Sequence, residues 1–113
     1  MKHQESNLQQ QSVKWFRYAY PKFIIFAIPN GSQRNVITAS ILKAEGVLSG
    51  VSDLFLMEPR KGFHGLFIEM KIKPNKTTKE QDWFLQAAHQ RGYKCAICYS
   101  FDEFKNEIEN YLK

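Results

Sequence analysis

Apolar positions along the chain follow two different periods, and the segments that carry them alternate. Four segments repeat their apolar residues every three or four positions, which is typical of helices with one buried face. Four shorter apolar runs are bounded by turn-forming residues and indicate strands. The predicted elements are, in chain order, helix 4–20, strand 23–28, helix 35–45, strand 53–57, strand 66–72, helix 78–91, strand 94–99 and helix 101–112.

This order of elements predicts the fold class. Helices alternating with strands favour an α/β sandwich around a central mixed sheet of about four strands. A short turn joins the two middle strands, so they should be antiparallel, whereas the last strand follows a helical crossover and should run parallel to its partner. Thr77 followed by Glu80 predicts a capping box at the start of helix 78–91, and Gly92 its C-terminal cap. A chain of 113 residues is expected to form a single domain over residues 1–113.

The stretch GLFIEMKIK at residues 65–73 places two charges inside an apolar strand. Charged side chains avoid buried strands unless something compensates them. Because side chains alternate along a strand, Glu69 and Lys71 share one face. A short hairpin would bring Asp53, at the start of the preceding strand, close to Glu69. Two converging carboxylates repel each other unless a cation lies between them, and hard oxygen ligands suit Mg²⁺ or Mn²⁺.

A structural ion pair is the alternative interpretation of these charges. It would join Lys71 to Glu69 or to Asp53 at an edge of the sheet. The Glu-x-Lys pattern is a weak signal by itself, because any charged strand can produce it. A metal site, however, also accounts for the charges that interrupt apolar strands, which an ion pair does less well.

The distribution of charge predicts a basic face. The net charge is +5, and residues 1–44 and 60–79 each hold six Lys or Arg and one acidic residue. Such asymmetry favours binding of a polyanion, with a solvated lysine-rich surface as the alternative. In the loop PNGSQR, Asn30 and Arg34 either contact backbone phosphates or only shape the turn. Three lysines flank the predicted carboxylate site and either track DNA or are simply solvated: Lys73, Lys76 and Lys79.

Other residues that often carry chemistry are interpreted as structural. Cys95 and Cys98 lie three apart on a predicted strand and point to opposite faces, which favours two buried core cysteines over a zinc or redox site. No function is assigned to the three histidines. Four aromatic residues at helical spacing are expected in the core rather than as base-stacking platforms: Trp15, Phe16, Trp83 and Phe84.

Nothing in the sequence indicates a membrane segment. The apolar run at residues 23–28 is far too short to span a bilayer. The first residues lack the apolar core of a signal peptide. We therefore expect a soluble, intracellular protein.

Taken together and in order, these motifs resemble the virus-type replication-repair nuclease (VRR-NUC) domain of the PD-(D/E)XK superfamily, in a stand-alone, phage-like form. The resemblance covers nearly the whole chain. One departure is Ser32, which stands where many members have a second glycine. The matching motifs are Glu5 with Gln9 as E-x-x-x-Q, PNGSQR (29–34) as the P-N-G loop, GVLSGVSD (46–53) before the catalytic Asp, IEMK (68–71) as E-x-K, and Gln81 early in the next helix.

The resemblance implies a restriction-endonuclease-like fold and metal-dependent hydrolysis of DNA phosphodiester bonds. Asp53 and Glu69 would hold Mg²⁺ or Mn²⁺ with the backbone carbonyl of Met70, and Glu5 would join directly or through a water. Lys71 would orient the attacking water or stabilise charge in the transition state. Gln9 and Gln81 would position the site or the phosphate.

Relatives of this stand-alone form resemble Holliday-junction resolvases and tend to be homodimers. For this chain we expect a homodimer in the cytoplasm of a bacterial or phage-infected cell. We therefore expect a structure-specific endonuclease acting on branched DNA. The alternatives are a flap or end nuclease of the same family, and a non-catalytic DNA-binding module with this fold. Five apolar residues either form the dimer interface or complete the monomer core: Ile37, Ile41, Leu42, Val47 and Leu48.

Overall fold

A four-stranded sheet with the strand order β1-β2-β3-β4 forms the centre of the computed structural model. The structure describes residues 3–29 and 36–113. Every predicted element is present, although each strand is shorter than the apolar run that predicted it. The elements are α1 (Gln4–Ala19), β1 (Ile25–Ala27), α2 (Val36–Ala44), β2 (Leu54–Leu56), β3 (Leu66–Met70), α3 (Lys79–Gln90), β4 (Lys94–Cys98) and α4 (Phe101–Leu112). The predicted loop contacts of Asn30 and Arg34 lie outside the described residues.

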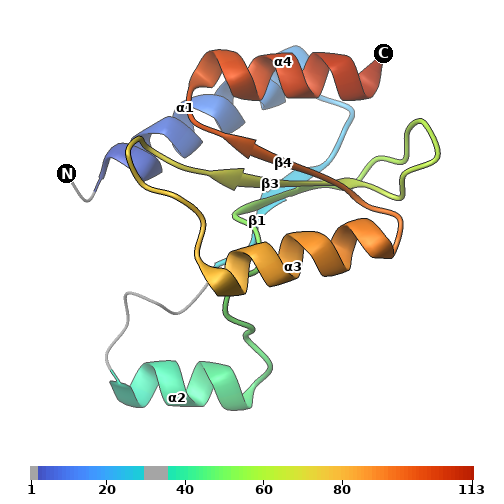
Figure 1. Cartoon of the computed structure of the whole chain (residues 1–113). Helices are drawn as coiled ribbons and strands as arrows, with labels where there is room; N and C mark the ends of the chain where they lie inside the picture. The colour runs from blue at the N-terminus through green and yellow to red at the C-terminus, as the bar shows by residue number, and fades with distance from the viewer. Residues whose placement is uncertain (1–2, 30–35) are drawn as a thin grey trace.

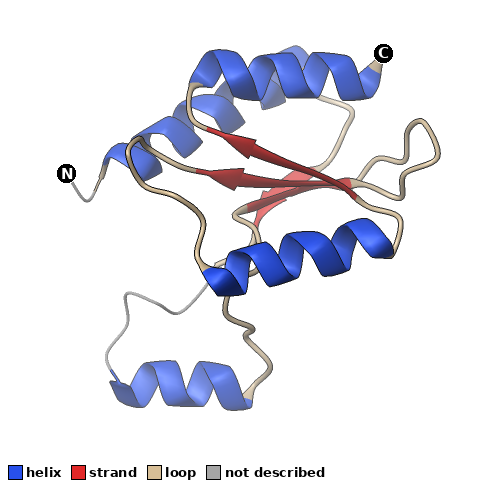
Figure 2. Ribbon diagram, viewed as in Figure 1, coloured by secondary structure: helices blue, strands red, loops and turns tan. Residues whose placement is uncertain are grey.

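The sheet is mixed, as predicted, and helices cover both of its faces. β1, β2 and β3 are antiparallel neighbours, and β4 pairs with β3 in parallel after the α3 crossover. Figure 1 shows α1 and α4 together on one face and α3 on the other. Figure 2 shows that α2 lies beyond α3, away from the sheet. Among the described elements, α2 makes at most marginal contact with any other helix or strand.

Strand alternation separates two different faces of the sheet. Aliphatic side chains of β2 and β3 face α1 and α4 and form the main core with residues such as Phe16 and Phe104. On the opposite face, Phe67 of β3 packs against Phe55 and against Phe84 of α3, with ring centroids 4.6 and 5.0 Å apart. The residues of β2 and β3 in the main core are Leu54, Leu56, Leu66, Ile68 and Met70.

The two cysteines point to opposite sides of β4, as their spacing predicts. Cys98 is fully buried in the main core, whereas Cys95 is partly buried and its thiol donates to the carbonyl of Leu85 at 3.4 Å. Burial raises the pKa of both thiols, that of Cys98 to about 12. Both thiols are free.

The capping box of α3 begins one residue later than predicted. Thr78, not Thr77, is the N-cap, and its hydroxyl accepts from the Gln81 N–H at 3.2 Å. The Gln81 side chain in turn accepts from the Thr78 N–H at 2.9 Å. The Thr77 hydroxyl is directed elsewhere and donates to the Asp82 carboxylate. At the other end Arg91 is the C-cap, and Gly92 follows it with a φ of 93°.

Trp83 corrects a second prediction, because it is not a core residue. It is 56% exposed, while its neighbour Phe84 turns toward the sheet. α3 is covered by the sheet on one side only, and Trp83 lies on the part of the helix that the sheet does not cover. The other predicted aromatics do pack inside: Phe16 is fully buried, and Trp15 packs against Tyr20, Phe101 and Phe104.

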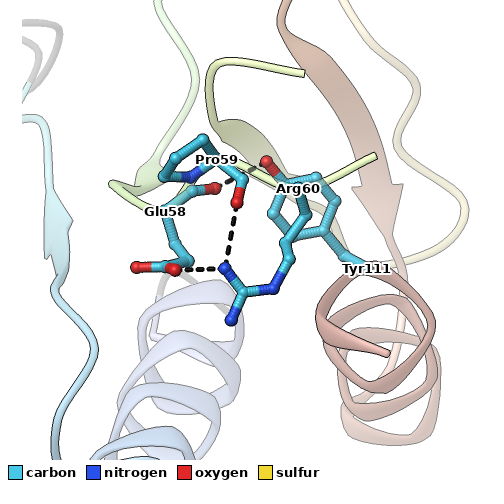
Figure 3. Close-up of polar contacts among 4 residues, drawn as sticks. All are labelled: Glu58, Pro59, Arg60 and Tyr111. Carbon is cyan, nitrogen blue, oxygen red and sulfur yellow. Dashed lines mark hydrogen bonds and ion pairs between the residues drawn. The ribbon is translucent and has the colours of Figure 1, made fainter. Parts of the chain in front are cut away.

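The turn between β2 and β3 is fastened to the end of α4 (Figure 3). The Tyr111 hydroxyl donates to the carbonyl of Glu58 at 2.7 Å. Arg60 pairs with the Glu58 carboxylate and donates to the carbonyl of Pro59 at 2.9 Å. Lys61 donates to the carbonyl of Asn110. These contacts hold the closed end of the hairpin. Asp53, Glu69 and Lys71 lie at its opposite, open end.

Candidate active site

Asp53 and Glu69 face each other across two antiparallel strands. The register pairs Leu54 with Ile68, and one step further it places Asp53 opposite Glu69. Asp53 Oδ2 also accepts from the backbone N–H of Met70 at 2.7 Å. This hydrogen bond joins the side chain just before β2 to the end of β3. The structure therefore brings together the two carboxylates that the sequence nominates as metal ligands.

The carboxylate pair is electrostatically strained without a cation. Burial, followed by repulsion from Asp53, raises the pKa of Glu69 from 4.5 to about 8, against the opposing effect of the Lys71 charge. Burial also raises the pKa of Asp53, and the hydrogen bond from Met70 works in the other direction. Two facing carboxyls, one buried and one partly buried, that resist ionising together would be stabilised by a positive charge between them.

Glu69 offers one oxygen atom that the protein leaves free. Its Oε2 accepts from Gln81 Nε2 at 3.0 Å. Its Oε1 is buried and has no hydrogen-bond partner among the described residues. Because a buried, unpaired polar atom is costly, an orphaned carboxylate oxygen opposite a second carboxylate fits a hard divalent cation such as Mg²⁺ or Mn²⁺.

The rest of a metal coordination sphere would come from other oxygen atoms. Within residues 3–29 and 36–113, no three His, Cys, Asp or Glu side chains group into a metal site. Mg²⁺ commonly binds through one or two carboxylates and keeps several waters, so two carboxylates suffice for it. The backbone carbonyl of Met70 follows Glu69 directly in the chain and is the expected further ligand.

Lys71 lies beside the carboxylates without neutralising them. It is only 8% exposed, and its backbone N–H donates to the carbonyl of Cys98 at 3.0 Å, which extends the pairing of β3 with β4. Its charge lowers the pKa of both Asp53 and Glu69. In the described part of the chain it is within salt-bridge distance of neither carboxylate. The simple ion pair considered from the sequence is therefore absent.

Glu5 and Gln9 approach the site from α1. The negative charge of Glu5 is the smallest of the effects that raise the pKa of Glu69, so Glu5 lies within electrostatic reach of the pair. Both residues line a groove of about 1140 Å³ between α1 and residues 72–75. Ala27 and Ile72 line it too, and the neighbouring Ile28 N–H donates to the carbonyl of Asp53 at 2.8 Å. Two residues that line the groove, Ala27 and Ile72, are thus close in the chain to residues of the site, although neither carboxylate lines the groove.

The groove adds basic residues that sequence reasoning missed. Lys14 and Arg17 line it together with Lys73, which was a candidate from the sequence. Helical spacing alone gave no signal for this pair, because Lys14 follows Glu5 by nine positions, or about two and a half turns, which places the two residues on different sides of an ideal helix. Lys76 and Lys79 are exposed and do not line the groove.

Comparisons with known proteins find one matching family model and solved structures of similar fold. A family model described as the VRR-NUC domain matches residues 1–102. A solved structure named "VRR_NUC domain protein" is 23% identical over 96% of this chain and 87% of that chain, with a TM-score of 0.79. A second, named "VRR_NUC domain", is 20% identical over 95% of this chain and 96% of that chain, with a TM-score of 0.64. No curated protein matches the sequence.

These likenesses establish the fold and the family. The mixed sheet between helical layers is the restriction-endonuclease-like fold, consistent with the PD-(D/E)XK superfamily. None of the described helices is long and apolar enough to cross a membrane. The match to the family model over residues 1–102 shows that the chain belongs to the VRR-NUC domain family, a family of nuclease type.

Proposed function

We propose that this protein is a Mg²⁺- or Mn²⁺-dependent, structure-specific DNA endonuclease that resembles Holliday-junction resolvases. The observation that carries the proposal is the facing pair of partly buried Asp53 and buried Glu69, with Glu69 Oε1 left without a partner among the described residues. Membership of a nuclease family that is generally metal-dependent supports it. The basic lining of the adjacent groove also favours a polyanionic substrate.

Each residue of the site has a proposed task. Asp53, Glu69 and the Met70 carbonyl hold the ion, and Glu5 contributes through a water. When bound, such an ion polarises the scissile phosphate and lowers the pKa of a water. Lys71 directs its ammonium at a non-bridging phosphate oxygen and stabilises the charge that grows there in the transition state.

The groove is proposed to bind the backbone of the substrate. Phosphate contacts fix the position of the DNA without reading its sequence. Gln9 offers an amide donor, and Lys14, Arg17 and Lys73 offer positive charge along the groove. Lys76 and Lys79 would extend the basic surface outside it.

A panel of DNA substrates tests this function directly. Labelled four-way junction, flap, duplex and single-stranded DNA would be incubated with Mg²⁺, with Mn²⁺ or with EDTA. We expect metal-dependent cleavage that is fastest on the junction. Cleavage confined to flaps or ends would favour the flap or end nuclease. Tight binding without cleavage of any substrate would favour the non-catalytic module.

Lys71→Ala is expected to slow the chemical step by about 10²–10³-fold, which is typical for loss of one donor to a developing oxyanion. Substrate binding should change little, because the contact proposed strengthens only in the transition state. Single-turnover cleavage and equilibrium binding would be measured on the same junction. Lys22→Ala, at an exposed lysine away from the groove, is the matched control. Weakened binding with an unchanged single-turnover rate would make Lys71 a phosphate contact only.

We also propose a homodimer, because a junction needs two symmetric cuts and a two-fold axis supplies two sites in matched orientation. Helix α2 stands apart from the sheet (Figure 1) and carries exposed Ile37 (74%) and Ile41 (54%), with Leu48 (49%) in the following loop. Leu42 and Val47 are partly buried beside them. An apolar helix face that the monomer leaves uncovered favours an interface over the alternative role in the core.

Light scattering at micromolar concentration should therefore report a dimer, and Ile37→Glu with Ile41→Glu should convert it to a monomer. Burying two carboxylates in an apolar interface is strongly unfavourable, so the loss should be complete. Ile24→Glu, at another exposed isoleucine, should leave the dimer intact. A parent protein that is monomeric both free and on junction DNA would remove the argument for a resolvase.

A further inference from the structure

Arg17 is attached to an edge of the sheet by a main-chain carbonyl. In the described part of the chain β1 is an edge strand, and the carbonyl of Ile24 and the N–H of Ile28 bond toward its neighbour β2. Main-chain groups alternate in direction along a strand, so those of Ile25 and Ala27 face away from β2. The outward carbonyl of Ile25 accepts from Arg17 Nη2 at 3.0 Å. The guanidinium therefore has a fixed place on the open edge of β1.

The positive charge of Arg17 is not neutralised by another side chain. Within residues 3–29 and 36–113 the one ion pair joins Arg60 to Glu58, so no carboxylate lies within salt-bridge distance of Arg17. A neutral carbonyl takes one of the five N–H donors of the guanidinium, and others remain for a ligand. Arg17 and Ala27 both line the groove, and Lys14 adds a second cation close by on α1. A fixed, unpaired guanidinium in a basic groove fits an anionic oxygen.

Arg17 lies some distance along the groove from the carboxylate pair. Glu5 is within electrostatic reach of Glu69, and Arg17 follows it by twelve positions on α1, which is about 18 Å at about 1.5 Å per residue. Along β1, Ile25 lies three residues before the N–H that bonds the Asp53 carbonyl, which is about 10 Å. One strand of duplex DNA advances about 3.4 Å per nucleotide, so these lengths correspond to about three to five nucleotides.

We propose that Arg17, on the open edge of β1, forms a second phosphate site that binds the DNA backbone about three to five nucleotides from the cleaved bond. Because Ile25 already holds the guanidinium in place, little side-chain freedom is lost when it donates to a phosphate oxygen. Such a contact reads no sequence but fixes where the strand lies relative to the carboxylates. The inference rests on the proposed function and deepens it, since the groove then sets the length of backbone that is bound.

A scan of neutral phosphates tests this site in the intact protein. A set of four-way junctions would each carry one uncharged methylphosphonate linkage, at successive positions on either side of the branch point. Binding would be measured in EDTA, and cleavage of the unmodified junction in Mg²⁺ would locate the cut. In the parent, neutralising the phosphate at the second site should weaken binding about tenfold, as expected for the loss of a hydrogen bond to a charged group.

Substitutions at Arg17 separate a phosphate contact from a structural role. Arg17→Met should bind the unmodified junction about tenfold more weakly, and neutralising the same phosphate should then cause no further loss. Arg17→Lys keeps the charge but loses the fork of donors, so it should recover only part of the affinity and of the sensitivity at that phosphate. Arg91 is the matched control, because it is exposed and donates to the Ala87 carbonyl at 2.9 Å but does not line the groove. Arg91→Met should respond to every linkage like the parent.

The outcomes separate this inference from the proposed function. If Arg17→Met binds more weakly but keeps the parent's sensitivity at every linkage, Arg17 only supports β1 and the phosphate site is overturned. Should Arg17→Met fail to fold in circular dichroism, an unchanged scan with Arg17→Lys would overturn it equally. Coupling of Arg17 to a phosphate that adjoins the cut would overturn the proposed position. A junction that is bound with one phosphate coupled to Arg17, but never cleaved, would overturn the nuclease function while the phosphate site stands.

Discussion

Glu69→Ala and Asp53→Ala are each expected to reduce junction cleavage by about 10³-fold or more. The bound ion is expected to supply several kcal/mol of transition-state stabilisation, and about 1.4 kcal/mol corresponds to a factor of ten. Either substitution removes one of the two side chains that face each other across β2 and β3. Cleavage would be followed under single-turnover conditions with saturating Mg²⁺, so that weaker substrate binding cannot imitate slower chemistry.

The fold and DNA binding should survive both substitutions. Removing one of two repelling carboxylates relieves the metal-free site, and the groove residues that are proposed to contact phosphates remain in place. Circular dichroism and binding of uncleaved junction in EDTA would verify this. Glu109→Ala, on α4, is the matched control. Cleavage by either site variant at the parent rate would contradict the assignment of the metal ligands.

The stability of the metal-free protein is expected to fall as the pH rises from about 4.5 to about 8. In this window the folded protein keeps a proton on Glu69, whose pKa is raised to about 8, while the unfolded chain with its ordinary value of 4.5 has lost it. The folded state then binds more protons than the unfolded state, so the free energy of unfolding decreases with increasing pH. The raised pKa of Asp53 acts in the same direction.

The size of this effect should be about 5 kcal/mol, because one pKa unit corresponds to about 1.4 kcal/mol and the pKa of Glu69 rises from 4.5 to about 8. Urea unfolding in EDTA at several pH values would measure it. Glu69→Gln should flatten the curve, because the amide carries no proton equilibrium, and saturating Mg²⁺ should restore stability at pH 8. The assignment of a raised pKa to Glu69 would be contradicted if the free energy of unfolding of the parent rises between pH 4.5 and about pH 8. It would also be contradicted if Glu69→Gln leaves this pH dependence unchanged.

The order of elements, the mixed sheet and the approach of Asp53 to Glu69 could be predicted because they follow from strand periodicity and a short hairpin. The start of α3 could not. Thr77 with Glu80 and Thr78 with Gln81 are two overlapping capping-box patterns, and local sequence favours neither decisively. In the structure Gln81 also reaches Glu69 on β3. This contact between distant segments favours the second pattern.

Which side chains are exposed, and which line the groove, also depended on how distant segments pack together. Helical spacing identifies an apolar stripe but not how much of it a neighbouring layer will cover, so Trp83 on α3 was wrongly predicted to be buried. Lys14 and Arg17 became candidates only when residues 72–75 were seen to close a groove against α1. Neither feature can be deduced from one segment alone.

The fastened turn between β2 and β3 offers a place to attach a reporter. Gly62 lies at its exposed tip, and nothing lies within 4 Å of a Cβ atom built there. Lengthening a loop costs little, about 0.6 kcal/mol for each doubling, and the paired strands keep their register. Burial raises the pKa of both native thiols, so they should react slowly with thiol-directed dyes. A short insertion at Gly62 that carries one cysteine would therefore take a fluorophore selectively, at the end of the hairpin opposite Asp53 and Glu69.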